Sequence, residues 1–381
     1  MPKMTFAIPC YNMEPWLPVC IESCLRQTEP DIEVLVVDDG STDGSAAIAD
    51  HYAAGDARVR VIHQDNQGHG KARQVAQDNA TGEFVLFLDA DDFIDKNTVR
   101  DMVGVAERDG VDAVCGNAVV FSDKTFNSRK YFYHPPASGL TFDDPRYWRS
   151  KVAWRWIIRR DVLVRHALKH PPYKSGQDFC FMLEVLTRID GFSQCGSFFY
   201  FFRQEHKPNH MSLDTLINHQ FASFRTAKDI LLDAGRVKPV IKFLQEMYFR
   251  DTRKIAVRLP DEGAQWGIKW LDVSLRIFKG LKPEYFTAEY LRPEVKCDRD
   301  FVPLALALCR QDKQAALSLL NSYTPAPNAI GHIMASDKER SRFHTWRRRL
   351  KAQLKPLSLR TRLAQRQLEK LAEDRLRTLR R

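Results

Sequence analysis

Apolar and polar segments alternate regularly along the first 125 residues of the chain. Short apolar runs typical of buried strands are separated by segments whose apolar residues recur at helical spacing, such as Leu17, Ile21 and Leu25. This alternation predicts an α/β fold, a mostly parallel sheet with helices on both faces. The expected strands are residues 5–9, 33–38, 58–63, 83–89 and 112–121.

The pattern changes after the last of these strands. Residues 122–149 are rich in Pro, Tyr and Asp and are expected to form an irregular loop region. Strand and helix patterns resume over residues 154–203, and beyond them helical spacing prevails. We therefore expect an α/β domain, a helical region and a tail at residues 1–215, 216–336 and 337–381.

The composition is that of a globular protein. The 381 residues suffice for two domains, and a hydrophobic content of 44% excludes disorder over most of the length. No apolar run is long enough for a spanning helix, and the first residues lack the pattern of a signal peptide. The eight cysteines have no zinc-site spacing, which is typical of reduced thiols. We therefore expect a cytoplasmic protein.

The net charge of +10 is concentrated in the tail. Residues 337–381 hold 16 Lys and Arg against 5 Asp and Glu, so the preceding 336 residues together carry −1. Apolar residues recur at helical spacing among these basic residues, which favours an amphipathic helix on an anionic membrane surface. They are Phe343, Trp346, Leu350 and Leu354 and, after Pro356, Leu368, Leu376 and Leu379. The alternatives are a helix packed on the protein body and a coiled-coil partner surface. Because no nucleic-acid recognition motif accompanies the tail, we expect no nucleic-acid partner.

Polar clusters follow three of the expected strands, namely Tyr11-Asn12, Asp38-Asp39 and the sequence DADD at 89–92. Ligands of open α/β sheets bind beyond the carboxyl ends of the strands, so the three clusters predict one site. Carboxylates spaced as in DADD are suitable ligands for Mg²⁺ or Mn²⁺. The alternative is structural, because Asp92 or Asp95 would also serve as the N-cap of a helix beginning near Lys96.

Residues 66–73, NQGHGKAR, form a glycine-containing loop that opens a helix. Lys71 and Arg73 are placed to approach a phosphate there, although a solvated first helical turn would have the same composition. No GxGxxG follows the first strand, and no GxxxxGK[ST] occurs anywhere. A Rossmann dinucleotide site and a Walker phosphate loop are therefore unsupported.

Four blocks resemble, in order, successive signatures of the family 2 glycosyltransferases. They are IPCYNMEPWLPVCIESCLRQT, VVDDGSTDGS, NQGHGKARQVAQDNATGEFVLFLDADD and SGQDFCF. The resemblance is close over residues 4–125 and looser over 150–212. It implies a GT-A fold, a nucleotide-sugar donor, Mn²⁺ or Mg²⁺ as cofactor, and inversion at the anomeric carbon.

The resemblance also implies roles for individual residues. Tyr11 would stack on the nucleobase, Asp39 would accept hydrogen bonds from it, and Asp89 would meet the ribose. Asp91 would hold the metal ion on the diphosphate, with Asp89 and His210 as further candidate ligands. His210 or Arg203 would approach the diphosphate. The residues implied in nucleotide-sugar binding are Pro9, Tyr11, Asn12, Asp39, Arg73, Asp89 and Asp91.

The catalytic base implied by the resemblance comes from an acidic pair before an aromatic residue. This chain has Gln177 at the first position of the pair, which leaves Asp178 as the candidate base, with Asp161 and Asp190 as weaker alternatives. One carboxylate suffices, since inversion needs a single group to take the proton of the acceptor hydroxyl. An N-cap role in the following helix would also explain Asp178.

These expectations describe an inverting hexosyltransferase that moves a sugar from a nucleotide diphosphate-sugar, of which UDP-sugars are favoured. The expected acceptor is a hydroxyl of a glycan or lipid-linked molecule in surface polysaccharide synthesis, which would place the enzyme at the inner face of the cell membrane. Two alternatives stay open. A nucleotidyltransferase would also use paired carboxylates, and an inactive homologue would serve as a binding or scaffold protein.

Overall fold

A computed structural model gives the structure of the chain and describes residues 1–122, 128–144, 152–204, 211–287, 289–291, 298–323 and 363–370. The chain divides into two compact units. The first comprises Met1–Pro172, Glu184–Lys207 and Trp346–Arg381, and the second comprises Tyr173–Leu183 and Pro208–Thr345.

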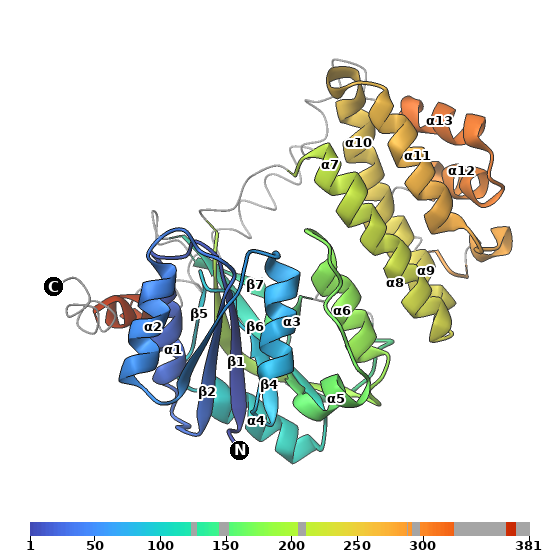
Figure 1. The fold of residues 1–381 in the computed structure, drawn as a ribbon. Coiled ribbons are helices and arrows are strands. Elements are labelled where there is room, and N and C mark those ends of the chain that lie inside the picture. Colours follow the sequence, from blue (N-terminus) through green and yellow to red (C-terminus); the bar gives the residue numbers. More distant parts are fainter. Residues whose placement is uncertain are drawn as a thin grey trace, which may run out of the picture. The chain divides into compact units, whose positions relative to one another are not determined.

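The first unit is built on one sheet (Figure 1). Four parallel neighbours form one part of it, in the order β3 (Val59–His63), β2 (Ile32–Asp38), β1 (Met4–Cys10) and β4 (Phe84–Phe87). The order continues through β9 (Trp156–Arg159), β6 (Ala113–Phe121), β10 (Phe192–Arg203) and β5 (Phe93–Ile94). Strand β9 is antiparallel to both its neighbours, β6 and β10 are parallel, and β5 is antiparallel to β10.

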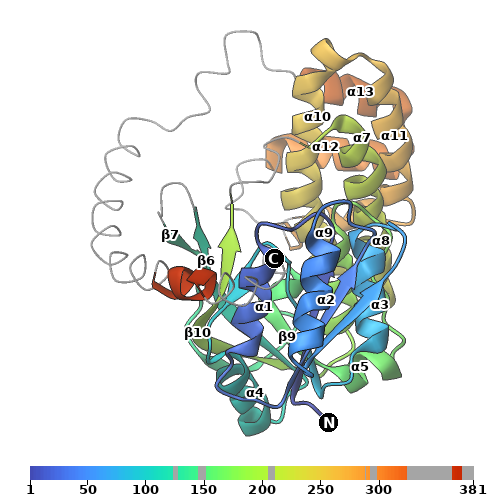
Figure 2. The same ribbon diagram turned by 60° about the vertical axis from the view of Figure 1, so that its left-hand side comes forward.

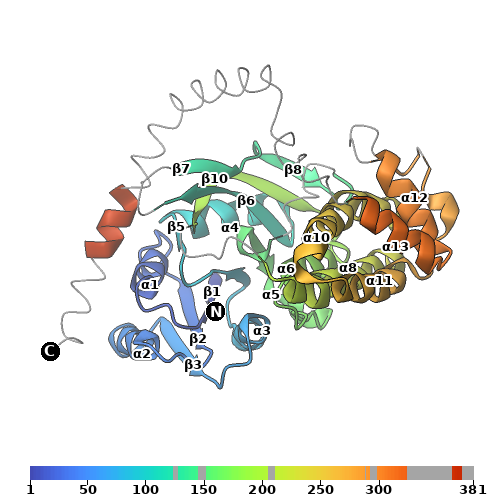
Figure 3. The same cartoon turned by 90° about the horizontal axis from the view of Figure 1, so that it is seen from above.

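Helices cover both faces of the parallel strands. Figure 3 shows α1 (Leu17–Leu25) and α2 (Ser45–Gly55) on one side of β1 and β2 and α3 (His69–Asn79) on the other. Strands β1 and β2 are buried along their whole length, as their continuous apolar sequences require when both faces are covered. The predicted α/β fold, a mostly parallel sheet with helices on both faces, is confirmed. The remaining helices of this unit are α4 (Thr98–Asp109), α5 (Arg160–Arg165) and η2 (Ala153–Arg155).

The prediction of an irregular loop at 122–149 is wrong for two segments. Strand β7 (Ser128–Phe132) pairs antiparallel with β6, and β8 (Ala137–Leu140) pairs antiparallel with β10. β7 exposes three of its five residues and β8 two of its four, because each strand pairs with only one neighbour. Edge strands of this kind carry charges and lack a continuous apolar run, so their composition resembles that of a loop.

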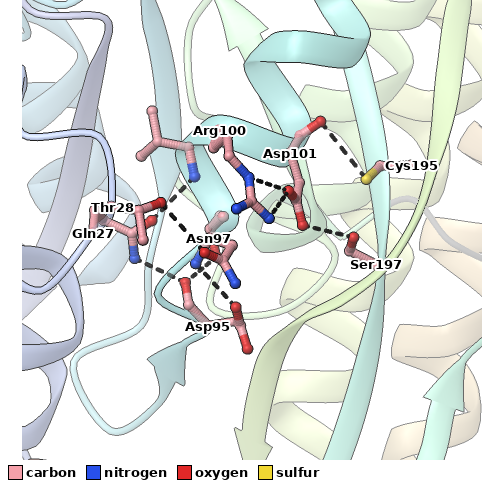
Figure 4. Close-up of polar contacts among 10 residues, drawn as sticks. Gln27, Thr28, Asp95, Asn97, Arg100, Asp101, Cys195 and Ser197 are labelled. Carbon is pink, nitrogen blue, oxygen red and sulfur yellow. Dashed lines mark hydrogen bonds and ion pairs between the residues drawn. The ribbon is translucent and has the colours of Figure 1, made fainter.

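The segment that follows β5 is fixed to α1 through side-chain contacts (Figure 4). The Gln27 amide donates to the carbonyl of Asp95 at 2.8 Å, and its oxygen accepts from the backbone N–H of Val99 at 3.0 Å. On α4, the helix that contains Val99, Asp101 accepts from the Ser197 hydroxyl of β10 at 2.9 Å. Helix α4 is thus tied to α1 at its start and to the sheet one turn later.

The second unit is helical, which confirms the helical C-terminal region expected from the sequence (Figure 2). Its core contains Tyr248 packed edge-on against Phe221 and Phe278. The division between the units passes through α6 (Gln177–Leu186). The other helices are α7 (Leu213–Thr215), η3 (Leu216–Phe221), α8 (Ala222–Asp233), α9 (Val237–Phe243), η4 (Leu244–Tyr248), α10 (Phe249–Glu262), α11 (Gln265–Phe278), η5 (Pro283–Tyr285), α12 (Asp298–Cys309) and α13 (Lys313–Ser322).

Part of the basic tail packs on the first unit. Residues 363–370 form a helix, the tail helix, drawn in red beside the sheet in Figures 2 and 3. Its Leu368 is buried in a cluster made by Val19, Phe93, Val119, Phe121 and Phe201. Leu368, one of the positions on which the membrane prediction rests, is therefore packed on the protein, and the others lie outside the described residues.

Among the described residues, no helix combines the length and the apolar character needed to cross a membrane.

The tail helix offers a matched pair of leucines for measuring what its packing contributes. Leu368 is 7% exposed and Leu363 is 53% exposed. We expect Leu368→Ala to lower the free energy of unfolding by about 2 kcal/mol, because it removes buried methyl groups and leaves a cavity. Leu363→Ala should change it by less than about 0.5 kcal/mol. Urea unfolding followed by circular dichroism measures both, and equal losses would contradict the packing.

Candidate active site

The loops that follow β1 and β2 are bound to each other. Asp39 donates its N–H to the carbonyl of Cys10 at 2.8 Å. The Asn12 side-chain oxygen accepts from the N–H of Thr42 at 2.8 Å, and the backbone N–H of Asn12 donates to the Ser41 hydroxyl at 3.0 Å. Asn12 has a φ of 54°, a left-handed conformation that asparagine adopts more readily than most residues. Its side chain therefore holds the two loops together.

Asp39 is buried and organises the loop before α3. Its Oδ1 accepts from the Gln64 amide at 2.7 Å and from the N–H of Gln67 at 2.9 Å, and its Oδ2 accepts from the N–H of Gly68 at 2.8 Å. Gly68 has a φ of 88°, which glycine tolerates without strain. The structure thus gives Asp39 a positioning role, and its contact with a nucleobase stays a prediction.

His63, at the end of β3, bridges two carboxylates. Its Nδ1 lies 3.1 Å from Asp38 and its Nε2 lies 2.9 Å from Asp50. Hydrogen bonding to Asp38, and then to Asp50, raises the pKa of His63 above its ordinary value. Because both ring nitrogens face carboxylate oxygens, the protonated ring donates to both. This bridge fixes the end of β3 next to the loop that carries Asp39.

Three carboxylates of the DADD segment form the carboxylate cluster, Asp89, Asp91 and Asp92, whose ligand atoms all lie within 4.8 Å of one another. Asp92 accepts from the Tyr200 hydroxyl at 2.8 Å and from the N–H of Arg203 at 2.7 Å, so each of its oxygens has a protein donor. Neither Asp92 nor Asp95 is the N-cap of α4, because that position is held by Asn97. The alternative that Asp92 caps a helix is therefore wrong, and Asp92 instead fixes the cluster to β10.

Tyr200 and Arg203 brace the cluster from β10. The Tyr200 hydroxyl also accepts from the N–H of Asp89 at 3.2 Å, and burial raises its pKa well above the ordinary value. Tyr200 therefore stays protonated and able to donate to Asp92. Arg203 donates its Nε to the carbonyl of Asp91 at 2.7 Å, and its guanidinium lies over the Phe121 ring.

Arg73 supports the cluster from α3. Its guanidinium is buried and donates to Asp89 at 2.7 Å, and the half-exposed His69 approaches the same carboxylate at 3.4 Å. His170 is buried edge-on against Phe87, and burial, followed by repulsion from Arg73, lowers its pKa well below the ordinary value. The neutral His170 thus adds no second positive charge beside Arg73.

The structure brings most predicted site residues to the carboxyl edge of the parallel strands. Asn12, Asp39, Arg73, Asp89 and Asp91 all lie on segments that leave this edge or face it. Tyr11 follows β1 at the same edge and is exposed. Two predicted residues lie elsewhere: Pro9 lies within β1, and Asp178 lies in the first turn of α6 in the second unit. His210 lies outside the described residues.

Sequence reasoning missed Tyr200, His63 and Gln64 as parts of this region. Tyr200 contacts Asp92 across 108 positions of the chain, and no local pattern identifies such a partner. The sequence pattern places His63 at the end of an expected strand and assigns it no role in the site. Its position opposite Asp38 in the parallel register of β2 and β3 is the signal that identifies the pair.

Comparison with known proteins gives consistent relatives. The family model Glycosyl transferase family 2 matches residues 5–166. An uncharacterized glycosyltransferase of Haemophilus influenzae is 41% identical over 197 residues, which are 50% of this chain and 74% of that protein. The uncharacterized glycosyltransferase EpsJ of Bacillus subtilis is 30% identical over 56% of this chain and 63% of EpsJ. The putative glycosyltransferase EpsH of the same organism is 34% identical over 45% of this chain and 51% of EpsH, so the chain spans between half and two thirds of these two relatives.

Among solved structures, S. aureus TarS 1–349 in complex with UDP-GlcNAc has a TM-score of 0.70 and 21% identity, covering 84% of this chain and 91% of that one. At this identity the likeness shows the fold alone, which is GT-A.

The His63 bridge predicts a pH-dependent contribution to stability. Because the folded-state pKa is raised, the contribution is complete below the unfolded pKa of about 6.5 and disappears as pH rises through the higher folded pKa. We expect His63→Gln to lower the thermal midpoint by about 1–3 °C at pH 6 and by less at pH 8.5, since a half-exposed ion pair contributes at most about 1 kcal/mol. The exposed His166 provides the control variant His166→Gln, and equal shifts at the two pH values would contradict the bridge.

Tyr200→Phe tests whether bracing from β10 holds the cluster in shape. The change removes one hydroxyl that serves Asp92 and Asp89, so we expect a loss of about 1–3 kcal/mol in stability. Mn²⁺ affinity in the presence of UDP should fall about tenfold, as for other residues that orient metal ligands. Titration calorimetry measures the affinity. Tyr248→Phe, the same change at a buried tyrosine of the second unit, should leave it unaltered.

Proposed function

This chain belongs to glycosyl transferase family 2, and from that premise we propose that it is an inverting, metal-dependent glycosyltransferase. The sugar would come from a UDP-sugar and go to a hydroxyl of a glycan or lipid-linked acceptor in surface polysaccharide synthesis. The observation that carries the proposal is the carboxylate cluster, three acidic side chains at the end of β4 inside the segment that matches the family.

The cluster fits a hard divalent cation, Mn²⁺ or Mg²⁺. Its ligands are carboxylate oxygens within 4.8 Å of one another, and such cations favour carboxylates together with phosphate oxygens and water. Because both oxygens of Asp92 serve Tyr200 and Arg203, we assign the metal to Asp91, with Asp89 as a second ligand. A cation bound there would neutralise the developing charge of the departing diphosphate.

Two further observations support a UDP-sugar as donor. Tyr11 exposes its ring just beyond β1, beside the loops joined by Asn12, where a uracil could stack. A structural neighbour, S. aureus TarS, has been solved with UDP-GlcNAc and with UDP. Pro9, Asp39, Arg73 and Asp89 complete the proposed donor site.

We assign the role of general base to Asp178. In an in-line displacement, the acceptor oxygen forms the new glycosidic bond while the bond to the diphosphate breaks, and one carboxylate takes the hydroxyl proton. Asp178 lies in the first turn of α6, two residues after Gly176. Gly176 has a φ of 79°, and a Cβ there would lie 2.0 Å from the Ser223 hydroxyl oxygen, so the turn that presents Asp178 requires glycine.

The family match disfavours the nucleotidyltransferase alternative. Turnover by the wild-type protein would exclude the inactive homologue. A location at the inner face of the membrane, reached through the basic tail, remains part of the proposal.

Two single substitutions separate the proposed roles. We expect Asp91→Asn to abolish turnover and to weaken UDP binding in the presence of Mn²⁺, because it removes the metal ligand. Asp178→Asn should abolish turnover and leave that binding within about twofold, because the base contacts only the acceptor proton. Calorimetry of UDP with Mn²⁺ measures binding, and UDP release from UDP-GlcNAc and a panel of other UDP-sugars measures turnover.

A loss of UDP affinity in the Asp178 variant as large as that in the Asp91 variant would show that the two roles are wrongly assigned. Full activity in both variants would refute the proposed site.

A further inference from the structure

Strand β7 presents an aromatic ring that folding leaves open. Tyr131, which lies between Lys130 and Phe132 on this edge strand, is 42% exposed although buried aromatic residues lie beside it. Its ring stacks on Trp154 at 6.1 Å and 16° and on Phe202 at 5.4 Å and 27°. The rings of Trp154 and Phe202 thus cover part of the Tyr131 ring, and the rest of the ring is exposed to solvent.

Stacked aromatic rings connect Tyr131 to the carboxylate cluster. Trp154, which is buried, stacks on Tyr200 at 4.3 Å, and the Tyr200 hydroxyl donates to Asp92. Phe202 precedes Arg203, whose N–H donates to the same carboxylate. Two connections therefore fix the orientation of Tyr131 relative to the cluster.

A second tyrosine of the same segment differs in one respect. Tyr133 is 53% exposed, and its ring stacks on Phe198 at 5.6 Å. The ammonium group of Lys130 lies 4.0 Å from the centre of the Tyr133 ring. Within the described part of the chain, no ring or cation besides Trp154, Phe202 and the tilted Phe132 contacts Tyr131, so Tyr131 keeps an open face and Tyr133 does not.

The position of Tyr131 in the sheet separates it from the predicted nucleotide side. Tyr11 follows β1, the carboxylate cluster follows β4, and Tyr131 lies on β7, which pairs with β6. Strands β1 and β6 are three strand positions apart, roughly 14 Å at about 4.8 Å per strand. The cluster lies between the two tyrosines in this order. In an in-line displacement the acceptor approaches the anomeric carbon from the side opposite the diphosphate. In strand order, Tyr131 lies on the far side of the cluster from the proposed nucleotide site.

We propose that the open face of Tyr131 is a subsite for a pyranose ring of the acceptor glycan. This inference rests on the proposed glycosyltransferase function. A pyranose presents a face of C–H groups and a rim of hydroxyls, so it packs its C–H face on an aromatic ring while the rim stays hydrated. The exposed Arg129 of the same strand supplies donors for the rim.

Binding of a short oligosaccharide tests the subsite on the full chain. Chitotriose is the probe, and sorbitol, an open-chain polyol without a ring face, is its control. Saturation-transfer NMR with titration, in the presence of UDP and Mn²⁺, gives the dissociation constants. The variants are Tyr131→Ala, Tyr131→Phe and the matched control Tyr133→Ala.

We expect Tyr131→Ala to weaken chitotriose binding about tenfold, which corresponds to about 1.4 kcal/mol. Tyr131→Phe keeps the ring and should bind within about twofold of the wild type, as should Tyr133→Ala. Sorbitol should show no saturation transfer. Calorimetry of UDP with Mn²⁺ on the same samples shows that each variant is folded.

Three results would overturn the inference while the proposed function stands. They are undetectable chitotriose binding by a wild type that binds UDP, an unchanged affinity in Tyr131→Ala, and an equal loss in Tyr133→Ala. If the wild type fails to bind UDP with Mn²⁺, the proposed function itself fails, and the acceptor subsite fails with it.

Discussion

Mutual repulsion among Asp89, Asp91 and Asp92 is the constraint on which the first unit depends. Two like charges about 4.8 Å apart repel by about 3 kcal/mol at an effective dielectric constant of about 20. The fold offsets this with Arg73 on one side and with the Tyr200 hydroxyl and the Arg203 N–H on the other. These donors come from two distant elements, α3 and β10. The cluster is therefore a product of the completed sheet, and its residual negative potential is what a divalent cation would complement.

Strand β10 connects several parts of the first unit. Through Ser197 it fixes α4, and through Tyr200 and Arg203 it fixes the cluster. One face contributes Phe202 to the stacked rings, while Phe201 on the other face packs against Leu368. Successive residues of a strand point to opposite faces of a sheet, so Phe201 and Phe202 reach different faces; the irregular register lies earlier, between Gln194 and Tyr200.

The sequence pattern predicts the parallel strands and their helices closely, because strands buried on both faces have continuous apolar sequences. The strand expected at residues 33–38 corresponds to β2 at Ile32–Asp38, and the one at 112–121 to β6 at Ala113–Phe121. Strands β7 and β8 escaped this reasoning, because a single partner and an exposed face leave few apolar positions to detect. The polar segments after β1, β2 and β4 were expected at one edge for a related reason, since neighbouring parallel strands end at a common edge.

The roles within the cluster were beyond the reach of local sequence patterns. Whether Asp92 serves as helix cap, metal ligand or support depends on Tyr200, which lies 108 positions away. The same holds for Asp39, whose three donors follow the next strand. Family resemblance supplied the candidates, and long-range hydrogen bonds show that Asp39 and Asp92 hold neighbouring segments in place.

The packing of Leu368 has a consequence for biosynthesis. The hydrophobic surface formed by Phe93, Phe121 and Phe201 belongs to strands that are complete at residue 203, but its cover is made roughly 170 residues later. At about 5–20 residues per second, a ribosome needs about 8–30 s for that stretch. During this interval the nascent sheet carries an apolar patch next to exposed strand edges. The first unit thus acquires its final surface only after the entire second unit has been translated, and chaperone demand should be greatest in that window.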